Sequence, residues 1–332
     1  MSIISIQSNL GVPKYKQIIA SIENAIVDGH VKRGDKLPSI NSIRNRFSLS
    51  RDTVMLAYNE LKVRGIVQSI PGKGYYIKSE DIRTKQKIFL LFDELNAFKE
   101  DLYNSFLSNL EENVVVDIFF HHFNHSVFSK LIYDNLGDYN YYVIMPANLK
   151  DIDGVIEKLP NDKVFILDQY HEELSRYPTI YQNFEKDMFN GLLDGVELLK
   201  KYKKLVLLFP EEKQPIGMYN GFTSFCKQNK FEYEVIATLN EREPNKGEVY
   251  LIPDDRNLIL IIKKIKEKRL ILSHDIGIIS YNDTLLKEIV EDGITTISTD
   301  FNKMGERLAQ MIKNKERLKI ENPNTLILRN SL

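Results

Sequence analysis

The residues with the clearest chemical potential stand at positions 50–53, which read Ser-Arg-Asp-Thr. Ser50 suits the N-cap position of a helix that begins there. At a helix start, Ser50 and Thr53 can bind phosphate oxygens, and the Arg51 guanidinium can bridge guanine O6 and N7 or hold a phosphate. Asp52 brings a negative charge close to phosphate unless it caps the helix or accepts a hydrogen bond from cytosine N4. These four residues therefore indicate contact with a nucleic acid.

A second candidate is the tripeptide Gly72-Lys73-Gly74, which joins two expected short strands at 66–70 and 75–77. Glycines let the backbone approach DNA closely while the Lys73 ammonium reaches into the minor groove. The alternative is a hairpin turn without a DNA contact. A P-loop is excluded, because the spacing of glycine, lysine and hydroxyl residue is not that of a P-loop.

Signals of a metal site or of catalysis are weak. His121, His122 and His125 follow an expected strand, but a zinc site needs a further ligand and a supporting shell of partners. We therefore expect a surface or helix-capping role for them and no metal. Cys226 lies on an expected amphipathic helix at 221–229, which predicts a core position. No nucleophile elbow occurs, so we expect neither an enzyme nor a cofactor.

The charges divide the chain into two unlike parts. The chain has 332 residues, 43% hydrophobic and 27% charged, as in an ordinary globular protein of two or three domains. Residues 1–85 contain 14 Lys and Arg against 7 Asp and Glu, a net charge of +7. Residues 86–332 contain 31 against 39, a net charge of −8. A small basic part favours binding to a polyanion, and the larger acidic part must have another task.

The cysteine count and the N-terminus bear on the compartment. A single cysteine allows no intramolecular disulfide, which favours a reducing environment. Residues 1–13 lack the basic start and long apolar core of a signal peptide, and apolar runs such as 258–262 are too short to cross a bilayer. We therefore expect a soluble cytoplasmic protein.

The helices that position the basic residues are predicted from the spacing of apolar residues along the sequence. Apolar residues recur at helical spacing in 15–26, 40–47 and 54–61, and Gly29 and Gly65 end the first and third of these helices. The two short strands described above come next. Three helices followed by a hairpin are typical of a winged helix, which we place at residues 1–78.

A charged segment at 79–87 predicts a linker, and short apolar strands then alternate with amphipathic helices. Such alternation predicts parallel α/β sheets covered on both faces. We expect two Rossmann-like lobes in residues 88–332, lobe 1 at about 88–182 and 300–320 and lobe 2 at about 183–299 and 321–332. The expected strands are 88–92, 114–120, 141–145, 163–168, 204–209, 232–236, 248–252 and 276–281. Helices are expected between most of them, for instance at 98–112 and 188–201.

Segment 29–77 carries a family pattern. It reads GHVKRGDKLPSINSIRNRFSLSRDTVMLAYNELKVRGIVQSIPGKGYYI and closely resembles the winged helix-turn-helix of GntR-type bacterial repressors. The resemblance implies binding to double-stranded operator DNA. The segment departs from the family pattern at Asn41 and Met55, where many relatives carry arginine. Asn41 could bind adenine through a bidentate pair of hydrogen bonds instead. The implied DNA-binding residues are Lys14, Ser39, Asn41, Arg44, Ser50, Arg51, Asp52, Thr53, Gly72, Lys73 and Gly74.

The C-terminal part resembles the effector domain of LacI-type repressors, which shares the type I periplasmic-binding-protein fold. Segment 248–283, EVYLIPDDRNLILIIKKIKEKRLILSHDIGIISYND, and segment 294–312, ITTISTDFNKMGERLAQMI, carry the resemblance. It implies a sugar between two lobes, bound by polar groups at strand ends. The implied effector-binding residues are Asn96, Phe98, Asp168, Phe184, Asp187, Asp254, Asp255, Asn282 and Phe301.

Several of these residues have simpler explanations. An aspartate after a strand often caps the next helix, and Phe301 could belong to the core between the lobes. Met218 stands where the family often has an arginine that binds a sugar hydroxyl or carboxylate, which argues against an acidic ligand.

The resemblances together imply a homodimeric repressor whose operator affinity is controlled by a neutral sugar, with L-fucose or L-arabinose as the best candidates. Such fusions are known among arabinose- and fucose-responsive repressors. The alternatives are a regulator that senses a phosphorylated sugar, and one whose C-terminal domain is catalytic or binds another protein.

Overall fold

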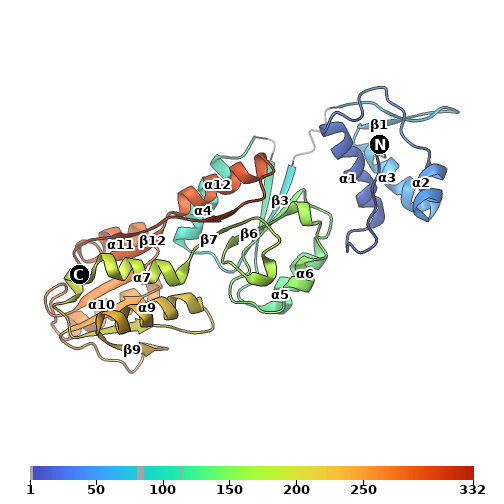
Figure 1. Ribbon diagram of the computed structural model, residues 1–332. Helices are drawn as coiled ribbons and strands as arrows, with labels where there is room; N and C mark the ends of the chain where they lie inside the picture. The colour runs from blue at the N-terminus through green and yellow to red at the C-terminus, as the bar shows by residue number, and fades with distance from the viewer. Residues whose placement is uncertain (1–2, 81–85, 113) are drawn as a thin grey trace.

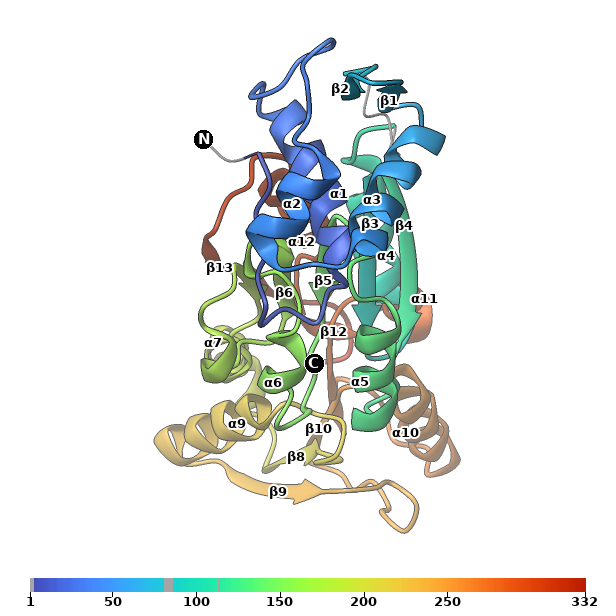
Figure 2. The ribbon, with the colours of Figure 1, turned by 90° about the vertical axis from the view of Figure 1, so that its right-hand side faces the viewer.

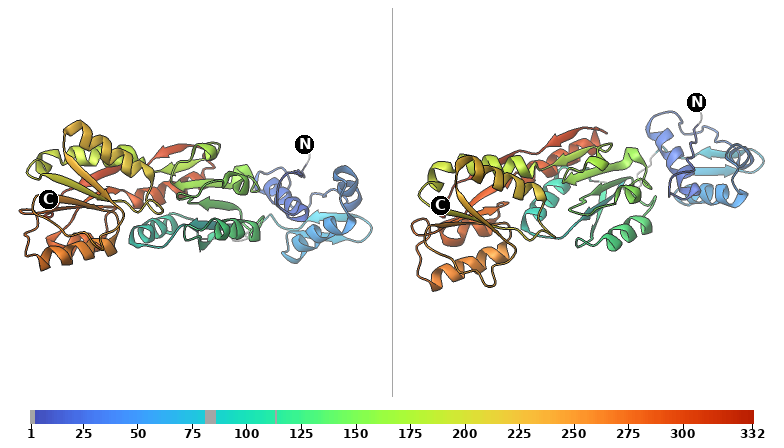
Figure 3. Two further views of the ribbon diagram at one scale, coloured as in Figure 1. Left: turned by 90° about the horizontal axis from the view of Figure 1, so that it is seen from below. Right: turned by 60° about the horizontal axis from the view of Figure 1, so that its bottom comes forward.

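The computed structural model describes residues 3–80, 86–112 and 114–332. Figures 1 and 3 show three bodies in a row: a small helical domain that contains the N-terminus, a central α/β lobe, and a second α/β lobe at the far end. Within the described residues, no helix combines the length and apolar character needed to cross a membrane.

The N-terminal body is three helices followed by a two-stranded antiparallel sheet. Its core gathers Ile18 and Ile22 of the first helix, Tyr58 and Leu61 of the third, and Ile77 of the second strand. The elements are α1 (Lys14–Val27), α2 (Ile40–Phe47), α3 (Arg51–Val63), β1 (Val67–Ile70) and β2 (Gly74–Ile77).

Lobe 1 is a six-stranded parallel sheet with the strand order β13-β7-β6-β5-β3-β4. Helices α4 and α12 pack on one face of the sheet and α5 and α6 on the other. Gly305 of α12 lets that helix lie close against α4, because a Cβ there would come within 2.4 Å of the Leu102 carbonyl oxygen. The elements are β3 (Gln86–Phe92), α4 (Ala97–Ser108), β4 (Val114–Phe120), α5 (His125–Asp134), β5 (Tyr141–Ile144), α6 (Asp153–Ile156), β6 (Val164–Asp168), β7 (Thr179–Tyr181), α12 (Phe301–Lys313) and β13 (Lys319–Glu321).

Lobe 2 is a second six-stranded sheet with the order β14-β12-β11-β10-β8-β9, parallel except for β14. Helices α7 and α9 cover one face and α10 the other, as Figure 2 shows. The elements are α7 (Phe184–Asp194), α8 (Val196–Leu199), β8 (Lys204–Leu208), α9 (Ile216–Asn229), β9 (Glu232–Ile236), β10 (Glu248–Ile252), α10 (Asp255–Glu267), β11 (Gly277–Tyr281), α11 (Leu285–Ile289), β12 (Thr295–Thr299) and β14 (Asn324–Ile327).

The chain passes between the lobes three times, after β7, after β12 and after β13. The buried Asn322 ties the three passages together. Its backbone N–H donates to the Tyr181 carbonyl at 2.8 Å, and its side-chain amide donates to Thr299 Oγ1 at 2.8 Å and to the Asp300 carbonyl at 2.9 Å. One asparagine therefore connects all three segments that pass between the lobes.

The predicted fold class is confirmed: a winged helix precedes a two-sheet α/β domain. Single elements differ from expectation. The helix expected at 98–112 ends at Ser108, and the helix expected near 188–201 begins at Phe184 and breaks at Gly195. The edge strands β13 and β14 and the inner strand β7 were not predicted, because three or four residues are too few to show an alternating pattern.

Candidate functional site

Helix α3 begins as its sequence predicts. Ser50 is the N-cap, and its hydroxyl accepts a hydrogen bond from the Thr53 backbone N–H at 3.1 Å and lies 2.8 Å from Thr53 Oγ1. Arg51 and Asp52 occupy the first turn and are exposed. Arg51 forms no ion pair with the described part of the chain, so its guanidinium is available to a ligand at this helix start.

The hairpin turn is shaped by its two glycines. Gly72 and Gly74 have φ of 72° and 109°, values that favour glycine, and the Lys73 backbone N–H donates to the Ile70 carbonyl at 3.0 Å. Lys73 is exposed at the tip. Tyr58 of α3 stacks on Tyr75 of β2 with the ring centroids 4.6 Å apart, which fixes the hairpin against the helix.

The other predicted DNA-binding residues lie on the same small domain. Ser39 caps α2 by accepting from the Ser42 backbone N–H at 3.1 Å. Asn41 and Arg44 are exposed on α2. Lys14, at the start of α1, is half-buried, and its ammonium donates to the Gln7 carbonyl. Lys14 therefore already has a partner within its own domain.

The winged helix contacts lobe 1 directly. Lys16 of α1 forms an ion pair with Asp138, and the Gly11 backbone N–H donates to the Lys158 carbonyl at 3.2 Å. Gly137 lies so close to α1 that an added Cβ would come within 2.7 Å of Val12. A movement of lobe 1 can thus reach the DNA-binding domain through these contacts.

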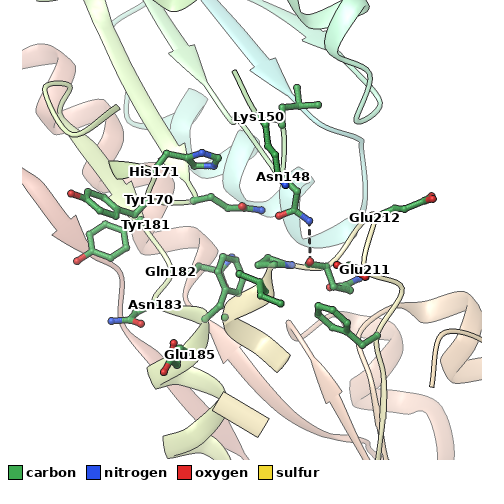
Figure 4. A pocket seen from close by; sticks show the side chains of 18 of the residues that line it. Asn148, Lys150, Tyr170, His171, Tyr181, Gln182, Asn183, Glu185, Glu211 and Glu212 are labelled. Carbon is green, nitrogen blue, oxygen red and sulfur yellow. Dashed lines mark hydrogen bonds between the residues drawn. The ribbon is translucent and has the colours of Figure 1, made fainter. Parts of the chain in front are cut away.

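A cleft of about 970 Å³ opens between the lobes at the carboxyl ends of the parallel strands. Figure 4 shows its walls, with the Asn148 side chain of lobe 1 bonded at 2.9 Å to the Gln214 carbonyl of lobe 2. The polar and aromatic lining residues are Asn148, Lys150, Gln169, Tyr170, His171, Glu173, Tyr181, Gln182, Asn183, Phe184, Glu185, Phe209, Glu211, Glu212 and Gln214.

The charge of the cleft is negative. Its lining includes four glutamates, Glu173, Glu185, Glu211 and Glu212, against the one lysine, Lys150. Aromatic side chains supply flat apolar surface between these charges. This combination suits a ligand that carries hydroxyl donors and has an apolar face.

Buried polar residues continue from the cleft into the molecule. Gln182 lines the cleft, and its amide donates to Asp168 Oδ1 at 2.6 Å. Asp93 and Lys99 form a buried ion pair whose charges act on Asp168. Burial raises the pKa of Asp168 to about 6, although the Lys99 ammonium opposes this shift.

Lobe 2 adds Asp187, Tyr281 and Asn282 to the same buried group. Burial and the charge of Glu321 raise the pKa of Asp187 to about 7. Burial and the charges of Asp187 and Asp168 raise the pKa of Tyr281. The ring of Tyr281 lies 6.2 Å from that of Phe184 in the cleft wall, measured between centroids.

Several buried atoms of this group lack a hydrogen-bond partner within the described residues. They are His121 Nδ1, Gln182 Oε1, Asp187 Oδ2, Tyr281 OH and Asn282 Oδ1. His121 Nε2 lies 3.0 Å from the Met145 carbonyl oxygen and must donate to it, which leaves Nδ1 as an acceptor. The unpaired atoms are therefore acceptors, but the Tyr281 hydroxyl can also donate, and so can the Asp187 carboxyl while it holds a proton, below about pH 7. Unpaired buried polar atoms are costly, so a ligand with donors is the natural complement.

The predicted effector residues divide into two sets. Phe184, Asp168, Asp187 and Asn282 lie in the cleft wall or in the buried group. The others have local partners: Asn96 and Asp254 cap α4 and α10, Asp255 pairs with Lys287 at 3.1 Å, and Phe98 and Phe301 stack at 4.8 Å. For this second set the local contacts favour a role in helix capping, ion pairing or core packing over contact with a ligand.

Met218 is buried in α9 and lines a narrow gap beside Tyr281. Among the described residues, no group of three or more His, Cys, Asp or Glu is arranged to hold a metal. Within the cluster of three histidines, His121 is fully buried and His125 starts α5. Cys226 is buried, as is usual for a core cysteine.

Some residues at the site were missed from the sequence. Asp93 follows β3 just as Asp168 ends β6, so the same strand-end rule could have found it. Lys99, Gln182 and Tyr281 gave no such signal, because a buried lysine or glutamine looks like any surface residue until the fold brings it to a partner.

Comparison with known proteins identifies the family to which the N-terminal part is similar. Residues 14–77 match the family model described as bacterial regulatory proteins, gntR family. The chain is 34% identical over 99 residues to the transcriptional repressor YtrA of Bacillus subtilis, covering 30% of this chain and 72% of YtrA. It is 33% identical over 106 residues to the mannosyl-D-glycerate system repressor MngR of Escherichia coli, of which it spans only 42%.

One relative extends along the whole chain. The arabinose metabolism transcriptional repressor of Geobacillus stearothermophilus is 23% identical, with 91% of this chain and 90% of that protein covered.

Solved structures match the two lobes. The lac repressor dimer bound to operator and an anti-inducer has a TM-score of 0.62 at 16% identity and covers 75% of this chain and 94% of its own. A periplasmic binding protein/LacI regulator of Alkaliphilus metalliredigens, complexed with D-xylulofuranose, has a TM-score of 0.58 at 14% identity and covers 74% and 98%. These likenesses show a LacI-like fold for the two lobes. Through the match of its N-terminal part, the chain belongs to the GntR family of bacterial regulatory proteins.

Proposed function

We propose that the protein is a cytoplasmic transcriptional repressor that binds operator DNA through its winged helix and releases it when a small neutral sugar binds between the lobes. The DNA-binding domain would be residues 1–78. The linker predicted at 79–87 would end before β3, which begins at Gln86 and opens the effector domain; residues 81–85 of it lie outside the described residues. Arg51 at the start of α3 and Lys73 at the tip of the hairpin are the proposed principal DNA contacts, since both are exposed and form no ion pair with the described residues.

The observation that carries the sugar proposal is a set of buried oxygens without donors, one in the cleft wall and the others in the buried group described above. Gln182, Asp187 and Asn282 each present a buried oxygen without a donor among the described residues. Sugar hydroxyls donate to such oxygens, and the aromatic side chains of Phe184 and Tyr181 can cover a sugar face. The arabinose repressor and the D-xylulofuranose complex among the similar proteins support the same class of ligand.

The charge of the site disfavours a phosphorylated sugar. A phosphate would enter a cleft whose lining has four glutamates and one lysine, and it would meet acceptors rather than donors. The buried Lys99 is already paired with Asp93. A neutral pentose or hexose such as L-arabinose or L-fucose avoids this repulsion.

The structure offers a route from the ligand to the DNA. A sugar held by both lobes favours the lobe arrangement in which its contacts are complete. Rotation about the three passages joined by Asn322 would shift lobe 1, and the Lys16–Asp138 contact would carry that shift to α1. In a dimer this changes the spacing of the two winged helices on the operator.

Thermal melting against a sugar panel tests the ligand class. We expect L-arabinose or L-fucose to raise the melting temperature in a concentration-dependent manner, because a ligand that binds the folded state stabilises it by mass action. The phosphorylated forms of the same sugars should leave it unchanged. A rise with phosphorylated sugars alone would contradict the proposal, and a well-folded protein that responds to none would favour a protein-interaction role.

A homodimer is part of the proposal, because one winged helix makes too few base contacts for specific binding. Helix α11 exposes Leu285 and Ile289, which are 78% and 77% accessible, and this apolar pair is a candidate for the dimer contact. We expect light scattering to give twice the chain mass for the wild type and a shift toward monomer for Ile289→Glu. Ile271→Glu, at a separate exposed site, should remain dimeric; equal behaviour of both variants would place the interface elsewhere.

A further inference from the structure

Lys287 is a buried cation for which the proposed function has no role. Only 1% of its side chain is exposed, although it stands on the short helix α11 near the surface residues described above. Its ammonium donates to the Tyr281 carbonyl at 2.9 Å and to the Asn282 carbonyl at 2.6 Å. A third contact is the ion pair with Asp255 Oδ1 at 3.1 Å. All three ammonium protons therefore have acceptors.

The carbonyls that Lys287 holds belong to the end of β11, where the chain turns sharply. Asn282 has a φ of 58°, in the left-handed region that only a few non-glycine residues adopt. Its side-chain oxygen is one of the unpaired buried acceptors, and the hydroxyl of Tyr281 is another. On the far side of the turn, Asp283 accepts two hydrogen bonds of 2.7 Å from Arg329.

We propose that Lys287 is a positioning residue of the effector site: its ammonium holds the Tyr281 and Asn282 carbonyls so that the side chains of both residues keep their places in the buried group next to the cleft. The proposal rests on the proposed function, since it assigns Asn282 to the ligand. Lys287 itself does not contact the ligand, and Asp255 acts as its counter-ion rather than as a sugar-binding group.

The physical reason is the free-energy cost of leaving the Tyr281 and Asn282 carbonyls buried without a hydrogen-bond donor. Without the ammonium, two carbonyls would lie in a buried place with no donor, and the turn would relax to satisfy them with water. Relaxation of a left-handed residue changes the direction of its side chain, and small displacements of a binding group weaken binding strongly. Burial lowers the pKa of Lys287, while the carboxylates of Asp255, Asp283 and Asp254 oppose the shift and favour the charged form.

The test compares three variants of the full chain. Lys287→Met removes the ammonium while keeping a long apolar side chain, and Lys287→Gln keeps one amide donor. The matched control is Lys264→Met, since Lys264 of the same lobe also donates to three backbone carbonyls, those of Leu239, Asn240 and Arg242, but in a loop outside the proposed site.

Two readouts separate positioning from stability. Titration calorimetry with L-arabinose and L-fucose should show a loss of affinity of about tenfold or more for Lys287→Met, an intermediate loss for Lys287→Gln and no loss for Lys264→Met. Hydrogen exchange without sugar should show faster exchange of the Asn282 and Asp283 amides in Lys287→Met, a smaller increase in Lys287→Gln and no change in Lys264→Met. These amides normally donate to the Ile297 carbonyl and to Ser298 Oγ, both at 2.8 Å.

The outcomes are distinguishable. If the wild type binds neither sugar, the proposed ligand is wrong, and the exchange measurement still decides whether Lys287 orders the turn. Unchanged exchange at Asn282 and Asp283 in Lys287→Met would overturn the inference. Equal loss of sugar affinity in Lys264→Met would also overturn it, because the effect would then be a general loss of stability. If Lys287→Met does not fold, Lys287→Gln is judged by the same two measurements.

Discussion

Replacing Arg51 with alanine is expected to weaken specific DNA binding by about 30-fold to 10⁴-fold. One bidentate arginine–guanine pair is worth about 1 to 3 kcal/mol, and a dimer loses two of them. Arg51 is exposed in the first turn of α3 and its backbone is fixed by the Ser50 cap, so truncation removes the contact without disturbing the helix. The measurement is a fluorescence-anisotropy titration with double-stranded DNA that the wild type has selected from a random library.

The control lies on the same helix. Lys62→Ala removes an exposed positive charge from the last turn of α3, at the opposite end from Arg51, and should change the affinity by less than about threefold. Repeating the titration at several salt concentrations separates base from phosphate contacts: loss of a phosphate contact reduces the salt dependence, whereas loss of a base contact relaxes sequence preference. Wild-type affinity in a folded Arg51→Ala variant would show that α3 does not read DNA with this residue.

The DNA-binding part could be predicted from the sequence because its signals are local. The Ser50 cap, the helix that follows and the Gly72-Lys73-Gly74 turn each involve residues within a few positions of one another. Local hydrogen bonds and glycine conformations leave direct marks on residue type. The helical spacing in 54–61 predicts that Tyr58 faces inward, but it does not reveal that the Tyr58 hydroxyl donates to the Pro38 carbonyl or that its ring stacks on Tyr75 of the hairpin.

The effector site was predicted only in part, because it is assembled from distant segments. The acceptors of Gln182 and Asn282 belong to different lobes, and the hinge contact between Asn183 and Glu321 joins residues 138 positions apart. The strand-end rule selected Asp168 and Asn282, which lie in the buried group of the candidate site, and also Asp254, whose side chain caps α10. Strand ends supply both ligands and helix caps, and only the packing decides between them.

Asp187 makes the unfolding free energy depend on pH. In the folded protein its carboxyl keeps a proton up to about pH 7, because burial and the charge of Glu321 oppose ionisation, whereas the ordinary value is 3.8. Between these two pH values the folded state binds one more proton than the unfolded chain, so stability must fall as the pH rises through this window and then level off. The difference corresponds to at most about 4 kcal/mol, and with screening by solvent we expect about 2 kcal/mol.

Asp187→Asn should remove most of this dependence, because an amide of the same shape does not ionise. Urea unfolding should find the variant more stable than the wild type at pH 8 and more stable by a clearly smaller margin at pH 5, because only part of the window between pH 3.8 and about 7 has been crossed at pH 5. Asp194→Asn, exposed two turns further along α7, should follow the wild type at both pH values. A smaller pH dependence should persist from Asp168, whose pKa is about 6. Parallel curves for Asp187→Asn and the wild type would mean that Asp187 is ionised in the folded protein. In that case its carboxylate would already be charged in the absence of sugar, and the cost of burying it would have to be balanced by a donor from the ligand or from a closed arrangement of the lobes.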